Sequence, residues 1–195
     1  MATAFVSSRR FTQQEFSEWV EHESRYLPGH YELIDGRIVV TPPTKLQHGT
    51  LKVELARLLG NHVRRGLLGT ILDCGYDLPS GDTLEPDISF VAAGRLARHP
   101  ADDDIQGFCR VVPDLAVEIL SRSTAHLDRN KKKSIYERNG VREYWLVDRR
   151  RRSVTILQLG PIGFGVPEIV THGRIRSLVL PDLELTVEEI FSVLA

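Results

Sequence analysis

The stretch LAVEIL, residues Leu115 to Leu120, is the most apolar short run of the chain, and a single carboxylate, Glu118, interrupts it. A run this short and this apolar is typical of a strand that is buried on both faces of a sheet. An ionised carboxylate in such a strand is costly unless a metal, a lysine or hydrogen bonds stabilise it. Glu118 therefore needs a partner, and that partner should indicate what the protein does.

The composition is that of an ordinary globular chain. Of 195 residues, 42% are hydrophobic and 26% are charged, and the net charge is −1. This length fits a single domain over 1–195, with a core over about 12–191. The near-neutral charge excludes global basic character, although local basic patches remain open. The two cysteines form no CxxC, so neither a disulfide framework nor a cysteine-rich zinc site is expected.

The chain shows no targeting or membrane signal. The arginines near the N-terminus follow the short apolar part, and the long apolar stretch of a signal peptide is missing. No run approaches the roughly 18 apolar residues of a membrane helix. We therefore expect a cytoplasmic protein with no membrane association.

Four helices are expected from apolar residues at helical spacing or from capping signals. Two of them begin with a capping box, Thr12 with Glu15 and Thr186 with Glu189. Asp128 is expected to cap a third helix. The expected ranges are 12–23, 48–65 with Gly66 as its stop, 128–139 with Gly140 at its end, and a short helix after 186.

Strands alternate with these helices. Asp35 and Gly36 supply the positive φ angles of a tight hairpin turn. The expected strands cover 31–34, 37–40, 70–78, 87–91, 115–120, 143–148 and 153–159, with a polar loop over 95–107. This order predicts an α/β domain with one central mixed β-sheet flanked by helices.

Three Pro-Asp pairs occur, ending at Asp87, Asp114 and Asp182, and geometry distinguishes them. Asp114 and Glu118 lie on one strand about 13 Å apart, which is awkward for sharing a metal. Asp87 begins another strand, and neighbouring strands lie about 4.8 Å apart. Asp87 and Glu118 therefore converge if their strands pair. Asp182 falls late in the chain, in an edge strand or a turn.

Two further residues are candidates. Glu32 interrupts the apolar start of the hairpin, and it either faces solvent on an alternating strand or joins the acidic site. For any one of the lysines at 131–133, a solvated helix face is the simplest explanation. Lys132, however, shares a face with Tyr136, which marks the side that packs on the sheet. Lys132 is thus the lysine best placed to point toward Glu118.

These residues together form a known pattern. Pro86-Asp87 followed by Glu118 resembles the PD-(D/E)XK signature of restriction endonuclease-like nucleases. The likeness extends to a bacterial family of restriction endonuclease-like proteins and runs from about Thr12 to Phe191. The stretches that carry it are Tyr31–Gly36, His48, Glu85–Asp87, Pro113–Ser121, Lys132 with Tyr136, and Gly140–Asp148.

The resemblance implies a restriction endonuclease-like fold, a divalent metal and DNA as the substrate. The chain departs from the superfamily signature at one position, because Leu120 stands where a lysine follows the second acid. The family resemblance implies that this lysine has moved to the following helix, which fits Lys132.

The expected chemistry is hydrolysis of a phosphodiester, which needs a nucleophilic water and stabilisation of negative charge. Mg²⁺ (or Mn²⁺) binds carboxylates, waters and substrate phosphate, and Asp87 and Glu118, with the Ile119 carbonyl, offer such ligands. The metal would act as a Lewis acid and activate water. Lys132 would orient that water or neutralise developing charge. Glu32 would complete the ligand set directly or through water.

Some basic residues keep two interpretations. His48 is either a capping or packed histidine or, as the resemblance suggests, a residue that contacts phosphate or water. The four arginines of the turn 149–152 form either a solvated turn or a flank of the substrate groove. In the second case, Arg149 and Arg151 would make sequence-independent phosphate contacts.

The sequence therefore predicts a metal-dependent endonuclease that hydrolyses DNA, with no organic cofactor. It contains no Walker loop, GxSxG or HExxH motif, which removes support for nucleotide hydrolases, serine esterases and zincins. The alternative is a non-catalytic nucleic-acid-binding or regulatory protein on the same fold. A weaker alternative is hydrolysis of RNA or another phosphoester. A chain of this size could span a duplex as a homodimer.

Overall fold

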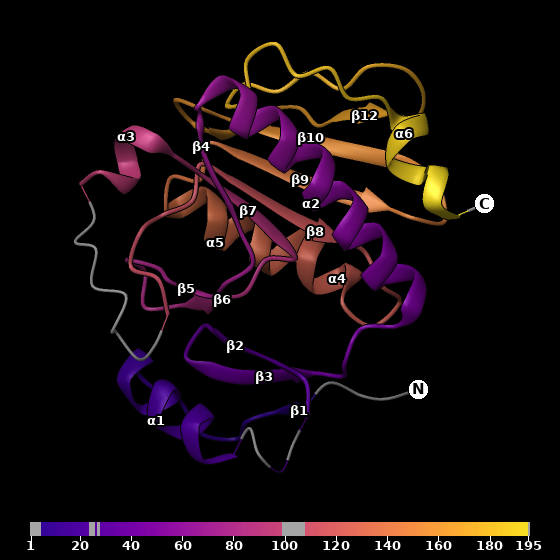
Figure 1. Cartoon of the computed structure of the whole chain (residues 1–195). Helices are drawn as coiled ribbons and strands as arrows, with labels where there is room; N and C mark the ends of the chain where they lie inside the picture. The colour runs from indigo at the N-terminus through magenta and orange to yellow at the C-terminus, as the bar shows by residue number, and fades with distance from the viewer. Residues whose placement is uncertain (1–4, 24–25, 27, 99–107, 195) are drawn as a thin grey trace.

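The computed structural model describes residues 5–23, 26, 28–98 and 108–194, and its strands form two sheets (Figure 1). The larger sheet contains β4 (Gly69–Leu72), β7 (Ile88–Ala92), β8 (Leu115–Ile119), β9 (Glu143–Asp148), β10 (Ser153–Gly160), β11 (Gly163–Phe164) and β12 (Glu168–Val170). The smaller sheet contains β1 (Phe5–Val6), β2 (His30–Ile34), β3 (Arg37–Thr41), β5 (Tyr76–Asp77) and β6 (Thr83–Leu84). The helices are α1 (Gln13–Glu23), α2 (Leu46–Gly66), α3 (Ala93–Leu96), α4 (Ala125–Leu127), α5 (Lys133–Arg138) and α6 (Val187–Phe191).

The larger sheet is mixed, as the sequence predicts. Its strand order is β11-β10-β9-β8-β7-β4, with β12 beside β10. Strands β8 and β9 run parallel, whereas the other pairs are antiparallel. Parallel strands need a crossover connection, and the helical stretch from α4 to α5 supplies it.

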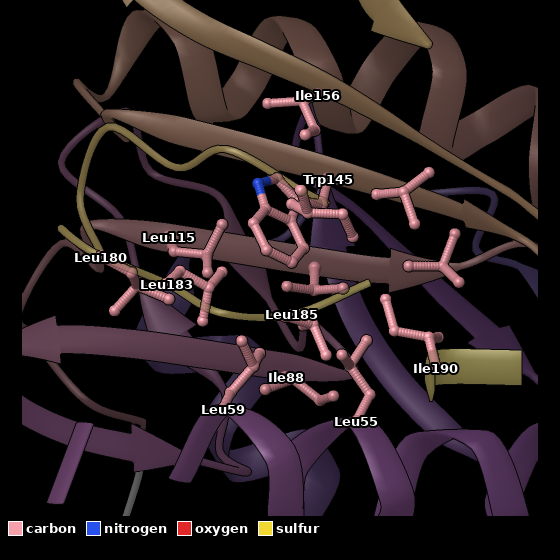
Figure 2. Packing of buried hydrophobic residues seen from close by; sticks show 14 of the residues in the cluster. Leu55, Leu59, Ile88, Leu115, Trp145, Ile156, Leu180, Leu183, Leu185 and Ile190 are labelled. Carbon is pink, nitrogen blue, oxygen red and sulfur yellow. The ribbon is translucent and has the colours of Figure 1, made fainter. Parts of the chain in front are cut away.

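Side chains pack against both faces of the larger sheet. Helix α2 and the C-terminal segment with α6 lie over one face, and α5 lies on the other (Figure 1). On the first face, Leu55 and Leu59 of α2 pack toward Ile88, Leu115 and Trp145 (Figure 2).

Side chains alternate along β8. Leu115, Val117 and Ile119 join the core beneath α2, whereas Ala116 and Leu120 join the core that includes Tyr136 of α5. Successive side chains of a strand point to opposite faces. Glu118 therefore faces the layer of α5, which is where its partner must come from.

The prediction of one sheet was incomplete. The expected strand over 70–78 is two strands, because β4 pairs with β7 of the larger sheet and β5 pairs with β6 of the smaller one. Between them, Gly75 packs so tightly on the ring of Phe108 that a Cβ would not fit. The hairpin over 31–40 is confirmed, with φ of 50° at Asp35 and 73° at Gly36, but it belongs to the smaller sheet.

Both predicted capping boxes are present. In α1, the Thr12 amide donates to the Glu15 carboxylate at 2.8 Å and the Glu15 amide donates to the Thr12 hydroxyl at 3.2 Å. Thr186 and Glu189 make the same exchange at α6.

Other boundaries were wrong. Leu67, rather than Gly66, adopts the left-handed conformation that ends α2, with φ of 51°. The short helix α3 occupies the start of the loop expected over 95–107, and 99–107 lies outside the described residues.

Helix α2 is amphipathic. Its 21 residues present Leu51, Leu55, Leu59 and Val63 to the core, at the i, i+4 spacing that places side chains on one face. Among the helices that the structure describes, none combines the length and the hydrophobicity needed to cross a bilayer.

We predict that Leu55→Ala lowers the free energy of unfolding by about 2–5 kcal/mol, because it leaves a cavity between α2 and the sheet. Val53 lies on the opposite, exposed face of α2, with 70% of its surface accessible. Val53→Ala should therefore change stability by less than about 0.5 kcal/mol. Urea unfolding of both variants measures this difference, and equal effects would contradict the described packing.

Candidate active site

Glu118 is buried in the layer of α5, with 4% of its surface exposed. Its Oε1 accepts hydrogen bonds from Nζ of Lys132 at 3.0 Å and from the Tyr136 hydroxyl at 3.1 Å. Lys132 therefore points inward, on the face that it shares with Tyr136. Within the described part of the chain, Oε2 of Glu118 makes no hydrogen bond, so this oxygen keeps both lone pairs available.

Asp87, just before β7, lies beside Glu118, near the end of β8. In the antiparallel pair of β7 and β8, Ile88 is opposite Val117, so the next position outward sets Asp87 opposite Glu118. The Asp87 side chain accepts from the backbone amide of Ile119 at 2.7 Å through Oδ2. Its Oδ1 lies 2.8 Å from Nε2 of His48, in the first turn of α2. Strand pairing thus brings together two acids that are far apart in the sequence.

Glu32 joins this cluster from the smaller sheet. Its Oε1 lies 2.8 Å from Nζ of Lys132 and accepts from the Glu85 amide at 3.0 Å. Because only 3% of Glu32 is exposed, the alternative in which it faces solvent is excluded. The hydrogen bond to Glu85, two residues before Asp87, fixes the hairpin of the smaller sheet to the start of β7.

Sequence reasoning missed Asp128. It was expected to cap a helix, but the helix begins at Ala125, and Asp128 starts a π-helical turn over Asp128–Lys132. Its buried Oδ1 has no hydrogen-bond partner among the described residues and lies 3.6 Å from Nζ of Lys132. The four-residue spacing of Asp128, Lys132 and Tyr136 was the available signal, because it places all three on one face.

The π-helical turn is integrated into the core. A π-helix replaces the i→i+4 hydrogen bond with an i→i+5 bond, is rare, and is frequent at functional sites. The backbone carbonyl of Asp128 accepts a hydrogen bond from the buried hydroxyl of Tyr144, at 3.0 Å. A side chain of β9 thereby holds the turn that carries Asp128 and Lys132.

The acids of the cluster have different proton affinities. Burial raises the pKa of Glu118 well above its ordinary value, and the nearby carboxylates add to this, against the opposing charge of Lys132. Burial likewise raises the pKa of Glu32 and Asp128. For Asp87, burial is outweighed by the His48 contact and the Ile119 amide, so its pKa falls below the ordinary value. Asp87 is therefore the acid that stays ionised most readily.

Lys132 keeps its charge. Although burial favours the neutral amine, the charges of Glu118, Glu32 and Asp128 raise the pKa of Lys132 well above its ordinary value. An ammonium of this kind donates hydrogen bonds and compensates negative charge, but it cannot serve as a general base.

The arginine turn divides by function. Arg149 donates to the Gln47 side chain at 3.0 Å, beside His48 at the start of α2, and Arg152 donates to the Phe191 carbonyl at 3.1 Å. The backbone amides of Arg150 and Arg151 bind Asp148, and both residues are exposed. Arg149 therefore lies beside the first turn of α2, whereas Arg152 contacts the C-terminal segment.

The other two Pro-Asp pairs lie outside the acidic cluster. Asp114 is 2% exposed and accepts from the Ala92 amide at 2.9 Å and from Arg95 at 3.1 Å. Asp182 is exposed in a turn, with φ of 57°.

The donor set fits one hard cation. Among the described residues, no three His, Cys, Asp or Glu side chains form a preassembled metal centre. Mg²⁺ commonly binds through only one or two carboxylates and completes its shell with water and phosphate. Asp87 and Oε2 of Glu118 are two such ligands on adjacent strands, so the residues present match this mode of binding.

We predict that Lys132→Met lowers the free energy of unfolding by about 3–5 kcal/mol, because it leaves buried carboxylates without a counter-ion. Without the ammonium, the pKa values of Glu32, Glu118 and Asp128 should rise further. Above about pH 4, the folded variant would then bind more protons than the unfolded chain, so its stability falls as pH rises. Urea unfolding should therefore show a smaller loss at about pH 5 than at about pH 8.

Lys131→Met is the matched control for this prediction. Lys131 is adjacent but exposed, and it pairs with the exposed Asp35 at 2.9 Å. This variant should lose less than about 1 kcal/mol at either pH. A Lys132→Met variant as stable as this control would contradict the buried charge cluster.

Comparisons with known proteins agree with this architecture. A family model named Uma2 and described as "Putative restriction endonuclease" matches residues 14–188. A crystal structure described as a putative nuclease belonging to DUF820, from Anabaena variabilis ATCC 29413, superposes with a TM-score of 0.75. The two chains are 21% identical, and the match covers 95% of this chain and 99% of that one.

No curated protein matches the chain with significant similarity. The structural neighbour shares the fold, which agrees with the α/β architecture of a mixed sheet flanked by helices expected from the sequence. Because the family model spans nearly all of the described residues, the chain belongs to the Uma2 family.

Proposed function

We propose that this protein is a metal-dependent endonuclease that hydrolyses phosphodiester bonds of DNA. One observation carries the proposal: Asp87 and Glu118 lie opposite each other at the ends of adjacent strands, with the buried ammonium of Lys132 bound to Glu118. Membership of a family described as "Putative restriction endonuclease" supports the same reaction class.

Asp87 and Glu118 would hold a divalent cation, Mg²⁺ or Mn²⁺, with the Ile119 carbonyl as a further ligand. Such a cation supplies Lewis acidity and lowers the pKa of bound water. His48 and the Ile119 amide orient the Asp87 carboxylate, and each oxygen of that carboxylate retains a lone pair for coordination. In this contact Asp87 is the acceptor, so Nε2 of His48 carries the hydrogen.

Lys132 would act on the attacking water or on the phosphate. An ammonium has three N–H donors. Glu32 and Glu118 accept two of them, at 2.8 and 3.0 Å, and Asp128 lies beyond hydrogen-bond distance at 3.6 Å. The N–H that faces Asp128, at the longest of the three distances, would be the donor that orients a water or stabilises charge on the transferred phosphoryl group. Glu32 has a supporting role, because it fixes the position of this ammonium.

The arginines support DNA as the substrate. Arg149 lies beside the first turn of α2, and the exposed Arg151 follows in the same turn. Guanidinium groups bind phosphates without reading sequence, and such contacts position a nucleic acid on a protein. A net charge of −1 makes these local contacts, rather than the overall field, the source of affinity.

We predict that the purified protein nicks supercoiled plasmid only when Mg²⁺ or Mn²⁺ is present. Asp87→Asn and Glu118→Gln should each reduce the rate at least about 100-fold, because each removes a charged ligand of the cation. Gel electrophoresis of the plasmid over time gives the rates.

Asp182→Asn is the control, since it changes the acid of a third Pro-Asp pair that lies exposed in a turn. This variant should cleave at the wild-type rate, and circular dichroism should show that all variants are folded. Metal-independent binding of DNA without cleavage, unchanged in both site variants, would favour the non-catalytic binding protein instead.

A second prediction concerns the metal alone. A cation that binds only the folded state should stabilise the wild type by about 2.7 kcal/mol at 100 times its dissociation constant, which raises Tm by several degrees. Asp87→Asn should abolish the shift, because it removes the acid that ionises most readily.

Thermal unfolding with and without millimolar Mg²⁺ measures this effect. Ca²⁺ at the same ionic strength shows how far the site distinguishes cations. An equal shift in wild type and Asp87→Asn would place the cation elsewhere.

A further inference from the structure

Cys74 and Cys109, the two cysteines of the chain, lie side by side. They are 35 positions apart in the sequence, yet their Sγ atoms are only 3.4 Å apart. Both are free thiols and both are partly exposed. Neither belongs to the acidic cluster, so an inference about them does not depend on the proposed nuclease activity.

The backbone holds these cysteines in register. The Cys109 amide donates to the Gly75 carbonyl and the Asp77 amide donates to the Cys109 carbonyl, each at 2.9 Å. These bonds form a parallel bridge between Tyr76 and Cys109. Because Gly75 has no side chain, the Phe108 ring packs directly on it, and the two segments approach closely. The proximity of the thiols is thus fixed by main-chain contacts.

We propose that Cys74 and Cys109 form a reversible intramolecular disulfide when the protein meets a hydroperoxide. A disulfide has an S–S distance of about 2.05 Å, so the sulfurs need to approach by roughly 1.4 Å. In the proposed disulfide, rotation of the two side chains would supply that distance. In a reducing compartment such a bond is transient and senses oxidation, rather than being structural.

The reaction balances with a hydroperoxide as the two-electron oxidant. One thiol sulfur attacks the O–O bond of hydrogen peroxide, which gives a sulfenic acid and one water. The second thiol then attacks the sulfenic sulfur, the S–S bond forms, and the hydroxyl leaves with the thiol proton as a second water. Two thiols are oxidised by two electrons, and one peroxide is reduced to two waters.

Burial raises the pKa of the Cys74 thiol to about 12. Since the thiolate is the nucleophile in both steps, disulfide formation should be slow at neutral pH and faster as pH rises.

The disulfide would close a ring over residues 74–109. This ring contains β5, β6 and β7, and hence links the smaller sheet to the larger one. Closing a loop of this length restricts the unfolded chain and so favours the folded state. Oxidation should therefore raise Tm by roughly 5–10 °C.

The test is to treat the folded wild-type protein with a small excess of hydrogen peroxide. We expect the intact mass to fall by two hydrogen atoms, a peptide map to contain the Cys74–Cys109 cross-link, and Tm to rise. Dithiothreitol should reverse all three changes. Neither Cys74→Ser nor Cys109→Ser should form the cross-link or lose two hydrogen atoms.

Three results would overturn the proposal. The first is that the folded wild type keeps both thiols free under a peroxide treatment that does oxidise the same protein unfolded in urea. The second is a gain of oxygen without loss of hydrogen. The third is a cross-link between two chains instead of within one. A Tm shift of equal size in the double variant Cys74→Ser/Cys109→Ser would show that oxidation elsewhere causes the stabilisation.

Discussion

The structure depends on one buried ammonium. Lys132, from the crossover between β8 and β9, lies within 3.6 Å of carboxylates from β2, β8 and its own helical turn. Each of these charges alone would be expensive to bury, and their mutual attraction makes the burial tolerable. Because Glu32 belongs to the smaller sheet and Glu118 to the larger one, this contact also joins the two sheets. The cluster is thus both a structural junction and a candidate site.

Asp87 has a different environment from the other acids. It is held by a histidine and a backbone amide rather than by the lysine, and its pKa is lowered where that of Glu118 is raised. Environments that separate the proton affinities of two neighbouring acids are characteristic of active sites. Asp87 and Glu118 therefore differ in how readily they ionise, although they lie opposite each other on adjacent strands.

Much of this site could be predicted because its signals are local. A carboxylate in an apolar strand requires a partner, and a four-residue spacing on a helix indicates which lysine points inward. Strand separation was sufficient to favour Asp87 over Asp114. These arguments use only the periodicity of single elements and the distance between neighbouring strands.

The remainder depends on contacts that sequence periodicity does not encode. The smaller sheet escaped prediction because β5 and β6 have two residues each, and β2 meets β6 through a single pair, Leu33 with Thr83. Such short strands show no alternation. Asp128 escaped because an aspartate before a helical stretch is a common cap, whereas this helix begins three residues earlier, at Ala125. The side chain was therefore assigned to a helix cap instead of to the buried charge cluster.

The π-helical turn over Asp128–Lys132 limits where residues can be inserted or deleted in this part of the chain. Each residue of an α-helix advances the direction of its side chains by about 100°. Deleting one residue within this turn would restore regular α-helical hydrogen bonding, yet it would rotate the preceding residues, Asp128 among them, relative to Tyr136. The helix would then be more regular, but the charged groups around Lys132 would be arranged less favourably. Insertions and deletions should consequently be selected against in this crossover, even where substitutions of its exposed side chains are neutral.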